Sequence, residues 1–446
     1  MNLLMETRMN NNKNRLSIAV ALGLLGSVAS SHTMAAGFQL AEYSATGLGR
    51  AYAGEAAIAD GADAQWRNVA MLTYLEGTQV SVGGIYVNPN IDVEGVSTQR
   101  SGTTSTKSED FAHDAFIPNL YVSHRVNEQV AIGFAVGTNY GMETDLGSDF
   151  SATNFGNEAS VITKEINVNM AYKINQQFSV GGGVRYVIAE GSFGATIPNQ
   201  SPTHIPTPIG NIPLPPAGTT LKYMEGTDEA WGWQVGTAWQ INDANRIGFS
   251  YKSEVKLDLA GHAKGAAFNP KNPTQHFAGS MALDLPATAE LASYHQLTDK
   301  VAIHASFNWT DWSSFEKLEA NIPTLGGKDL IKEENWEDNY RLAFGGTYQL
   351  NQKVTLRSGV AYDTSAVSDE DRTATIPETD RLWLSTGVGY AWSNNLTLDA
   401  GFTYIFAKDA KMSEDQGDEA ALFGGTFDGE TTGNVWLVGV QANYRF

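Results

Sequence analysis

The amino-acid sequence predicts an all-β fold, namely a 14-stranded antiparallel transmembrane β-barrel with an N-terminal plug, or hatch, inside its lumen. Three observations lead to this prediction. Apolar residues recur at every second position in many segments, and the connections between these segments alternate between short and long. Gly accounts for 45 of the 446 residues and aromatic residues for 10%, whereas charged residues make up only 17%. A soluble β-sandwich also alternates, but it has no reason to keep this rhythm of connections along the whole chain.

The composition excludes several function classes. The chain has no Cys, which rules out a thiol nucleophile and a cysteine-ligated metal. The net charge of −20 disfavours nucleic acid as a partner, because phosphate binding needs clustered Lys and Arg. The eight His residues are scattered without ligand spacing, and His304 and Ser306 are interpreted as barrel lining. We therefore expect neither catalysis nor a cofactor nor a metal.

The amino terminus predicts export. Lys13 and Arg15 precede an apolar run over 16–29, and Thr33 and Ala35 supply the small residues before a cleavage site. Residues 1–35 are predicted to be a signal peptide, whether translation starts at Met1 or at Met9. The run is too short to span a membrane.

Residues 36–76 precede the first strand and show almost no alternation, but contain stretches of small residues such as 54–59. Eight strands make a barrel that side chains can fill, whereas 16 to 18 leave an aqueous channel. A barrel of 14 strands lies between these sizes and would leak unless it were blocked. We therefore expect residues 36–76 to form a hatch and residues 77–446 to form the barrel.

The alternation is clearest at the carboxyl end, where Trp436, Val438 and Val440 share one face and Leu437 and Gly439 share the other. The same reading along the chain predicts strands at 78–88, 115–126, 129–140, 161–174, 177–190, 228–241, 244–257, 281–297, 300–311, 337–350, 353–363, 380–392, 395–407 and 433–446.

Short polar turns join these strands at one rim, for example at 127–128, 175–176 and 351–352. Long loops join them at the other rim, at 89–114, 141–160, 191–227, 258–280, 312–336, 364–379 and 408–432. This asymmetry is typical of bacterial outer-membrane barrels. Lys332 and the acidic residues Glu414, Asp415, Asp418 and Glu419 lie in long loops, and we expect them to be solvated.

Several sequence runs then identify a family. The predicted mature chain starts with AGFQL and continues with GLGRAYAGE at 47–55; later runs are NYG at 139–141, SEVKLD at 253–258, YRL at 340–342 and DRLWLS at 380–385. Together they make the chain resemble the FadL family of outer-membrane long-chain fatty acid transporters. The resemblance implies a hatch-plugged 14-stranded barrel, in agreement with the count above.

The resemblance also implies the site residues. Ala36, Gly37 and Phe38 would form a mobile amino terminus that lines an apolar ligand pocket, with Leu40 beside them. Ligand would be captured among the external loops, pass to this pocket by passive diffusion, and leave sideways through a gap in the wall. Long-chain fatty acids are the expected ligand.

The lateral gate is also implied by the resemblance. Asn139, Tyr140 and Gly141 would mark a kinked third strand at the gap. The hatch segment that faces this kink is typically Asn-Pro-Ala in the family; here it is Asn68, Val69 and Ala70, so the Pro is lost.

The residues that would hold an anionic head group are less clear. Arg185, Arg341 and Arg357 have the parity of inward positions and are candidates, although an internal salt bridge is the alternative for each. Uptake of monoaromatic hydrocarbons or other small apolar compounds by the same fold therefore remains open. A surface adhesin or phage receptor is a further alternative, and outer-membrane lipid and lipopolysaccharide are expected neighbours.

Overall fold

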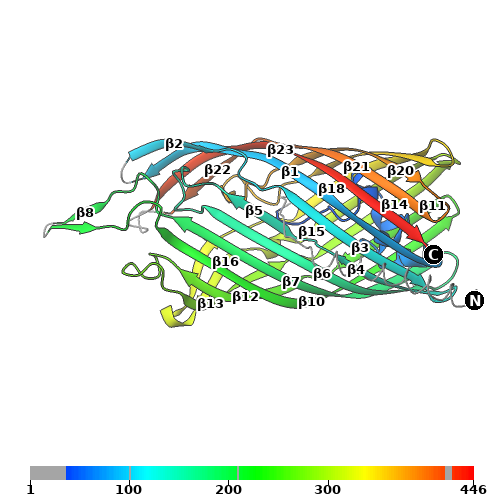
Figure 1. The fold of residues 1–446 in the computed structure, drawn as a ribbon, viewed down its shortest axis with the longest axis horizontal. Coiled ribbons are helices and arrows are strands. Elements are labelled where there is room, and N and C mark those ends of the chain that lie inside the picture. The colour runs from blue at the N-terminus through cyan, green and yellow to red at the C-terminus, as the bar shows by residue number, and fades with distance from the viewer. Residues whose placement is uncertain (1–36, 100–101, 208–209, 417–423) are drawn as a thin grey trace, which may run out of the picture.

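The computed structural model describes residues 37–99, 102–207, 210–416 and 424–446 (Figure 1). The predicted signal peptide, Ala36, Asp418 and Glu419 lie outside the described residues. In the described part of the chain, 21 strand segments join in one continuous antiparallel sheet that forms the 14 strands of a closed barrel wall. The fold-class prediction is confirmed.

The segments of the wall follow one another in chain order. They are β1 (Thr78–Gln99), β2 (Gly102–Ser108), β3 (Ala115–Arg125), β4 (Val130–Gly137), β5 (Gly141–Asp145), β6 (Glu158–Lys173), β7 (Phe178–Thr196), β10 (Thr220–Asn242), β11 (Asn245–Lys252), β12 (Val255–Lys264), β13 (Phe277–Leu285), β14 (Thr288–Thr298), β15 (Val301–Thr310), β16 (Lys317–Ile322), β17 (Gly327–Glu333), β18 (Asn339–Gln349), β19 (Val354–Asp363), β20 (Arg381–Ala391), β21 (Leu396–Ala407), β22 (Ala410–Asp415) and β23 (Gly425–Arg445).

The barrel closes where its first and last strands meet. β1 pairs antiparallel with β23 in unbroken register from Gln79 opposite Arg445 to Gln99 opposite Gly425. A separate hairpin, β8 (His204–Thr207) and β9 (Gly210–Pro213), projects from the long-loop end (Figure 1). Closure leaves the wall without an exposed edge along this seam.

Many wall strands are longer than the alternation predicts. β1 continues to Gln99 and β23 begins at Gly425, so ladders occupy much of the segments at 89–114 and 408–432 that we expected to be loops. The segments at 191–227, 258–280 and 312–336 likewise contain strand residues. Backbone hydrogen bonds hold a ladder beyond the membrane, where neither face must be apolar, so the period-2 signal fades before the strand ends.

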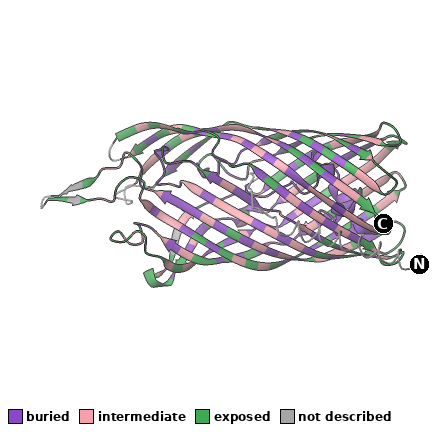
Figure 2. Cartoon of the chain, viewed as in Figure 1, coloured by how far each residue is buried: buried purple, intermediate pink, exposed green. Residues whose placement is uncertain are grey.

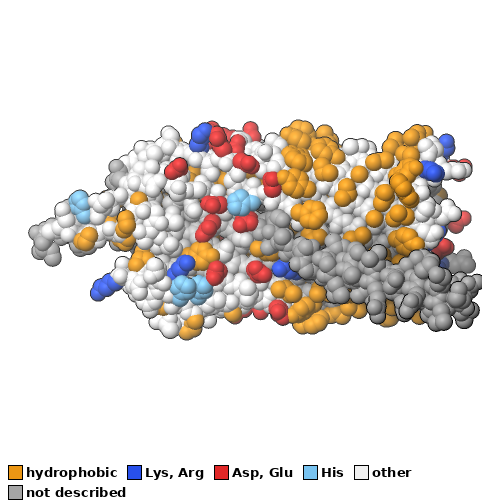
Figure 3. Space-filling model, viewed as in Figure 1, with side chains coloured by type: hydrophobic (Ala, Val, Ile, Leu, Met, Phe, Trp, Pro, Cys, Tyr) orange, Lys and Arg blue, Asp and Glu red, His pale blue; other side chains and the backbone are white. Residues whose placement is uncertain are grey.

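The outer face of the wall is apolar over part of its length. Buried and exposed residues alternate along the strands (Figure 2), and outward side chains such as Val168, Trp231 and Leu291 are more than half exposed. Hydrophobic side chains gather over the half of the wall near the short turns, whereas acidic and basic side chains appear farther toward the long loops (Figure 3). Such an apolar band is what the wall of a transmembrane barrel presents to lipid.

The residues before β1 lie inside the barrel (Figure 1). They form α2 (Ala45–Leu48) and the 3₁₀ helices η1 (Glu55–Ala57), η2 (Ala62–Trp66) and η3 (Val69–Tyr74), and nearly all are buried. Two further 3₁₀ helices, η4 (Trp312–Ser314) and η5 (Pro323–Leu325), lie between wall strands. None of the helices in the described ranges is long and apolar enough to cross a membrane.

Glycines on the inner wall make room for this hatch. A Cβ on Gly248 of β11 would lie 1.8 Å from the Ala56 carbonyl oxygen, and a Cβ on Gly359 of β19 would lie 2.0 Å from the Arg50 carbonyl oxygen. The hatch backbone therefore approaches the wall more closely than any side chain would permit. Within the hatch, Arg50 forms ion pairs with Glu55 at 2.8 Å and with Asp60 at 2.5 Å, which ties its turns together.

Several wall strands are interrupted partway along their length. The interruptions separate β4 from β5, β11 from β12, β13 from β14, β15 from β16, and β17 from β18. Contacts link two of them, since the Tyr140 hydroxyl donates to the Pro286 carbonyl at 2.7 Å. Residues in these short breaks are free of the alternation of a strand, so they can turn large side chains into the lumen.

Candidate functional site

Five aromatic residues, Phe38, Tyr140, Trp312, Phe315 and Trp336, form a buried group that we call the aromatic cluster. The Phe38 ring lies at its centre, 4.6 Å from Trp312, 5.8 Å from Phe315, 6.0 Å from Trp336 and 6.1 Å from Tyr140 between ring centroids. Phe38 comes from the hatch, whereas the other four come from interruptions of the wall. Such edge-to-face and tilted contacts are favourable for aromatic rings.

Beside the cluster lies a space of about 40 Å³, which we call the apolar cavity. Its lining includes Phe38, Met142, Phe193, Leu283 and Ile376. A volume of this size holds about one or two water molecules and no hydrocarbon chain. A ligand can therefore enter only if part of the lining, of which Phe38 is the hatch residue, moves away.

Gly37 is held against the aromatic cluster in a conformation that favours glycine. Its φ is +62°, and a Cβ at this position would lie 2.4 Å from the Trp336 ring and 2.7 Å from the Trp312 ring. Its N–H is directed at the carboxylate of Glu378. The first described residue of the hatch is thus fixed both by packing and by a polar contact.

The wall has a gap beside the aromatic cluster. β3 pairs with β4 over 120–125, but beyond this point the contact between the two strands resumes only as a single bridge between Ala112 and Thr144. β5 pairs with β6 on its other side. The edge that faces β3 over residues 138–142 has no partner in the wall among the described ladders.

The hatch fills part of this gap. Gln39 forms an isolated antiparallel bridge with Tyr140, in which the Leu40 N–H donates to the Asn139 carbonyl at 2.6 Å and the Gly141 N–H donates to the Phe38 carbonyl at 2.8 Å. The structure therefore brings together Gly37, Phe38 and Leu40 with Asn139, Tyr140 and Gly141. One short segment both occupies the aromatic cluster and bonds to the interrupted strand.

Asn68, Val69 and Ala70 lie beside β7 and β10, and η3, which begins at Val69, also contacts β4. A Cβ on Gly236 of β10 would meet the Asn68 amide, and one on Gly181 of β7 would meet the Ala70 nitrogen at 2.7 Å. Asn68 also caps η3 by accepting from the Ala70 N–H. The local sequence provides this helix cap, but the path of the chain inside the barrel decides which strands the segment touches.

The three candidate arginines differ in their partners. Arg185 is bidentate to Glu165, with Nε–Oε1 at 2.9 Å and Nη2–Oε2 at 2.8 Å, and Arg357 pairs with Asp399 at 2.7 Å. Arg341 has no ion pair with a described residue; it donates to the Ala51 carbonyl at 2.8 Å and lies 4.8 Å from the centre of the Trp383 ring. Arg185 and Arg357 are thus committed to internal pairs, and Arg341 is not.

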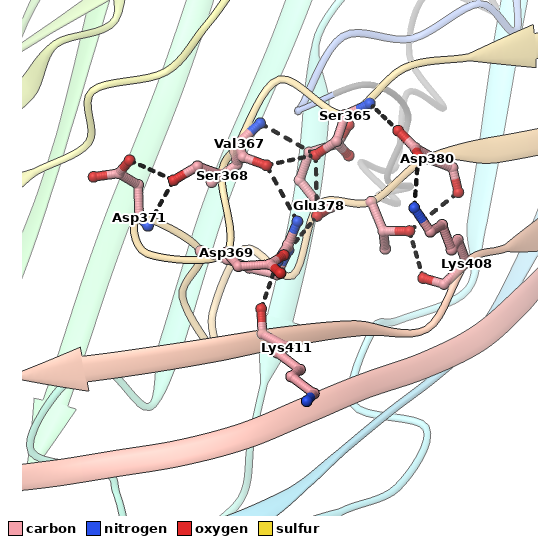
Figure 4. Close-up of polar contacts among 11 residues, drawn as sticks. Ser365, Val367, Ser368, Asp369, Asp371, Glu378, Asp380, Lys408 and Lys411 are labelled. Atoms are coloured by element: carbon pink, nitrogen blue, oxygen red, sulfur yellow. Dashed lines mark hydrogen bonds and ion pairs between the residues drawn. The ribbon is translucent and has the colours of Figure 1, made fainter.

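The loop at 364–380 folds into the barrel and closes one side of the apolar cavity, to which Thr375 and Ile376 belong. Arg372 holds the loop by donating from Nε to the Glu378 carbonyl at 2.6 Å and from Nη2 to the Val367 carbonyl at 3.1 Å. Figure 4 shows this network, which extends to Asp369, Lys408 and Lys411. Burial raises the pKa of the Glu378 carboxyl to about 7, although Arg381 opposes the shift.

Two residues that we expected to be solvated are drawn into the same region. Lys332 lines the apolar cavity and pairs with Glu414 at 2.8 Å, and the Glu414 side chain is only 8% exposed. Glu414 also accepts from the Ala374 N–H of the inward loop. The expectation fails because the loops fold over the lumen rather than into solvent.

Sequence reasoning did not find Trp312, Phe315, Trp336 or Lys332 as site residues. A signal was present, since the connection at 312–336 contains three large aromatic residues. Large aromatic residues in a fully solvated loop would form an exposed apolar patch. Such patches often mark binding sites. What the sequence lacked was the second segment, Gly37 and Phe38, on which they pack.

Comparison with known proteins agrees with this architecture. Residues 26–446 match the family described as outer membrane protein transport protein (OMPP1/FadL/TodX). The chain is 33% identical over 456 residues to a long-chain fatty acid transport protein of Escherichia coli O6:H1, covering 97% of this chain and 98% of that one. It is 35% identical over 443 residues to outer membrane protein P1 of Haemophilus influenzae, covering 92% and 95%.

Solved structures show the same fold. A FadL homologue of Pseudomonas aeruginosa superposes with a TM-score of 0.80 at 24% identity, covering 92% of this chain and all of that one. A toluene transporter of Pseudomonas putida, TodX, superposes with a TM-score of 0.67 at 15% identity, covering 92% and 100%. With a family match over nearly the whole chain, this protein belongs to the FadL/TodX family of outer-membrane transport proteins for hydrophobic compounds, which are transporters and not enzymes.

Proposed function

We propose that this protein takes up long-chain fatty acids across the outer membrane by passive diffusion, with the hatch amino terminus as its gate. One observation carries the proposal. The segment that places Phe38 in the aromatic cluster also bonds through its backbone to Asn139 and Gly141 at the gap in the wall. A ligand that displaces Phe38 must therefore also loosen the closure of the gap.

The energetics favour such a coupling. A fatty acid tail gains about 0.8 kcal/mol for each CH₂ group that leaves water, so a sixteen-carbon chain gains about 10 kcal/mol or more. Each of the two backbone hydrogen bonds at the gap contributes about 1 kcal/mol net. Burial of only a few CH₂ groups of the tail thus outweighs the loss of both bonds, and the displaced segment leaves a lateral path into the membrane.

The names of the relatives support the choice of ligand. The relatives that are 32 to 35% identical include proteins named for long-chain fatty acid transport, whereas the toluene transporters share the fold at 15 to 18% identity. Consumption of the ligand inside the cell would maintain the concentration gradient that drives net uptake.

The test is uptake of labelled oleate and labelled toluene by cells that lack their own transporter, with and without this protein. We expect oleate uptake that falls at least tenfold in Phe38→Asp and on deletion of residues 36–38, and that is retained in Phe38→Leu. Heat-modifiable migration on gels checks that each barrel has assembled. Toluene uptake without oleate uptake would overturn the proposed ligand, and oleate uptake unchanged by Phe38→Asp would overturn the gate.

A further inference from the structure

A second cavity lies next to the hatch amino terminus, and we call it the polar cavity. Phe38 lines the apolar cavity, whereas the next three residues, 39–41, line the polar one, which has a volume of about 40 Å³. Gln39 turns its side chain toward the wall on this side, where it accepts from the Thr310 hydroxyl at 2.8 Å. The hatch segment thus separates an apolar space from a polar one.

Three cationic side chains line the polar cavity, namely Arg67 from the hatch, Lys252 from β11 and Arg341 from β18. None of the three lies within 4.0 Å of a carboxylate oxygen of any described residue, whereas Arg185 and Arg357 are both ion-paired. Lys252 and Arg341 are only 5% and 7% exposed. The Nε atoms of Arg67 and Arg341 are buried without a hydrogen-bond partner.

Lys252 and Arg67 instead contact a neutral amide and aromatic rings, which do not neutralise a positive charge. The Lys252 ammonium donates to the Asn139 carboxamide at 3.2 Å and lies 4.5 Å from the centre of the Trp66 ring. The Arg67 guanidinium lies 5.0 Å from the centre of the Tyr43 ring. A buried cation without an anion is costly, because its lost hydration is not replaced.

Two carboxylates also face the polar cavity, but each is occupied otherwise. Glu290 accepts from the Ser306 hydroxyl at 2.7 Å and the Ala56 N–H at 3.2 Å, and Asp363 accepts from the Asn339 amide at 3.0 Å. The lining therefore contains three basic and two acidic side chains. An entering anion would therefore meet more basic than acidic side chains, and the acidic ones already accept hydrogen bonds.

We propose that the polar cavity is a carboxylate-binding site, in which Lys252, assisted by Arg67 and Arg341, binds the head group of a fatty acid. This proposal rests on the proposed function and assigns it a second binding position. Lys252 is the central residue because its partner Asn139 also accepts the Leu40 N–H at the gap in the wall. When residues 38–40 move, the cation lies beside the opening through which the ligand leaves.

The site would make transport selective for anions. The apolar cavity binds a hydrocarbon tail only through the apolar surface area that the tail buries. A fatty acid and the corresponding alcohol bury the same area there. Only the carboxylate gains a charge-assisted hydrogen bond from Lys252. The protein should therefore distinguish oleate from oleyl alcohol through Lys252, although both carry the same hydrocarbon chain.

The test compares the uptake of labelled oleate and labelled oleyl alcohol in cells that carry the wild type, Lys252→Met, Lys252→Arg or Lys353→Met. Lys353 is exposed in a short turn and serves as the matched control. We expect Lys252→Met to lower oleate uptake at least tenfold while oleyl alcohol uptake changes less than twofold. Lys252→Arg should recover most oleate uptake, which a purely structural role for the Lys side chain would not require.

Several results would overturn the proposal. Equal loss of both uptakes in Lys252→Met would reduce Lys252 to a structural role, and loss of neither would remove it from the path. An oleate-specific loss in Lys332→Met but not in Lys252→Met would place the head group at the apolar cavity instead. If Lys252→Met does not assemble, Arg67→Gln gives the same comparison, because Arg67 is only half-buried.

Failure of the proposed function looks different. A wild-type protein that takes up neither oleate nor oleyl alcohol contradicts fatty acid transport itself. In that case, binding of cis-parinaric acid and of its alcohol to the purified protein still tests the site. We expect the acid to bind the wild type at least tenfold more tightly than Lys252→Met, and equal affinities would overturn the inference.

Discussion

The two cavities beside the hatch amino terminus are about equal in size but differ in what holds them together. The apolar cavity is bounded by aromatic and aliphatic side chains, with Phe38 at the centre of four rings. The polar cavity is bounded by charged groups from four wall segments and the hatch. One short segment serves both, because Phe38 lines the apolar cavity and residues 39–41 line the polar one.

This difference teaches how a gate can be both closed and easily opened. Contacts in the apolar cavity are non-directional, so a hydrocarbon tail can replace the Phe38 ring with little loss. Hydrogen bonds and charges in the polar region are directional, and they hold the strands around the gap in one arrangement. Substitutions should therefore act on stability most in the polar region and on ligand binding most in the apolar one.

The largest expected effect is on the buried ion pair next to the polar cavity. Arg185→Met leaves the Glu165 carboxylate buried without its partner and removes the bond to the Ser253 carbonyl, so we expect a loss of about 3–5 kcal/mol in the free energy of unfolding. Urea titration in detergent micelles measures it. The double variant Glu165→Met/Arg185→Met should recover most of the loss, and a double variant as unstable as the single one would contradict this account.

The next effect tests the apolar side. Trp312 is fully buried and contacts the Phe38, Tyr140, Phe315 and Trp336 rings. Trp312→Ala should cost about 3 kcal/mol of packing, chiefly in the aromatic cluster, and should weaken oleate binding more than it lowers the stability of the barrel. Trp392→Ala is the matched control, because Trp392 is 65% exposed. An equal effect of both substitutions on binding would remove the cluster from the site.

A smaller effect depends on pH. The pKa of Glu378 is raised to about 7 by burial, so its neutral form is favoured in the folded state. The stability it contributes is fully present below about pH 4.5 and is lost as pH rises through about 7, by on the order of 1–3 kcal/mol. Protease cleavage of the loop at 364–380 should therefore be slower at pH 5 than at pH 8.

Two variants separate this effect from others. Glu378→Gln should abolish the difference in cleavage rate between pH 5 and pH 8, because the neutral amide does not titrate. Glu337→Gln should preserve the difference, since Glu337 is exposed. A loop whose cleavage rate is independent of pH in the wild type would show that Glu378 does not hold it.

The smallest expected effect lies at the boundary between the two cavities. Leu40→Pro removes the N–H that donates to the Asn139 carbonyl, at a net cost of about 1 kcal/mol. The closed gap should then open more often, so oleate uptake at low concentration should rise several-fold without a change in barrel stability. Leu40→Ala removes buried packing but keeps the N–H, so it separates the two contributions and should not raise uptake. Unchanged uptake in Leu40→Pro would disconnect the bridge from gating.

The sequence alone determined the wall, the number of its strands and the identity of the family. Alternation at positions such as Trp436 and Val438 reports which side chains face lipid, and this depends only on the period of a strand. Gly37 and Phe38 were also identified from the sequence alone, because they belong to the short motif AGFQL at the predicted mature start. Both signals are local, so neighbouring residues contain them completely.

Only the tertiary structure decided which side chains line the lumen and which partners they contact. Strands continue beyond the apolar band because partner strands supply hydrogen bonds, which no local pattern reports. Trp312, Trp336 and Phe38 meet only because interruptions in distant strands bring them together, and Arg185 acquires a partner that Arg341 lacks. Burial, ion pairing and the shape of a cavity depend on residues far apart in the chain, and only closure of the barrel around the hatch brings those residues into contact.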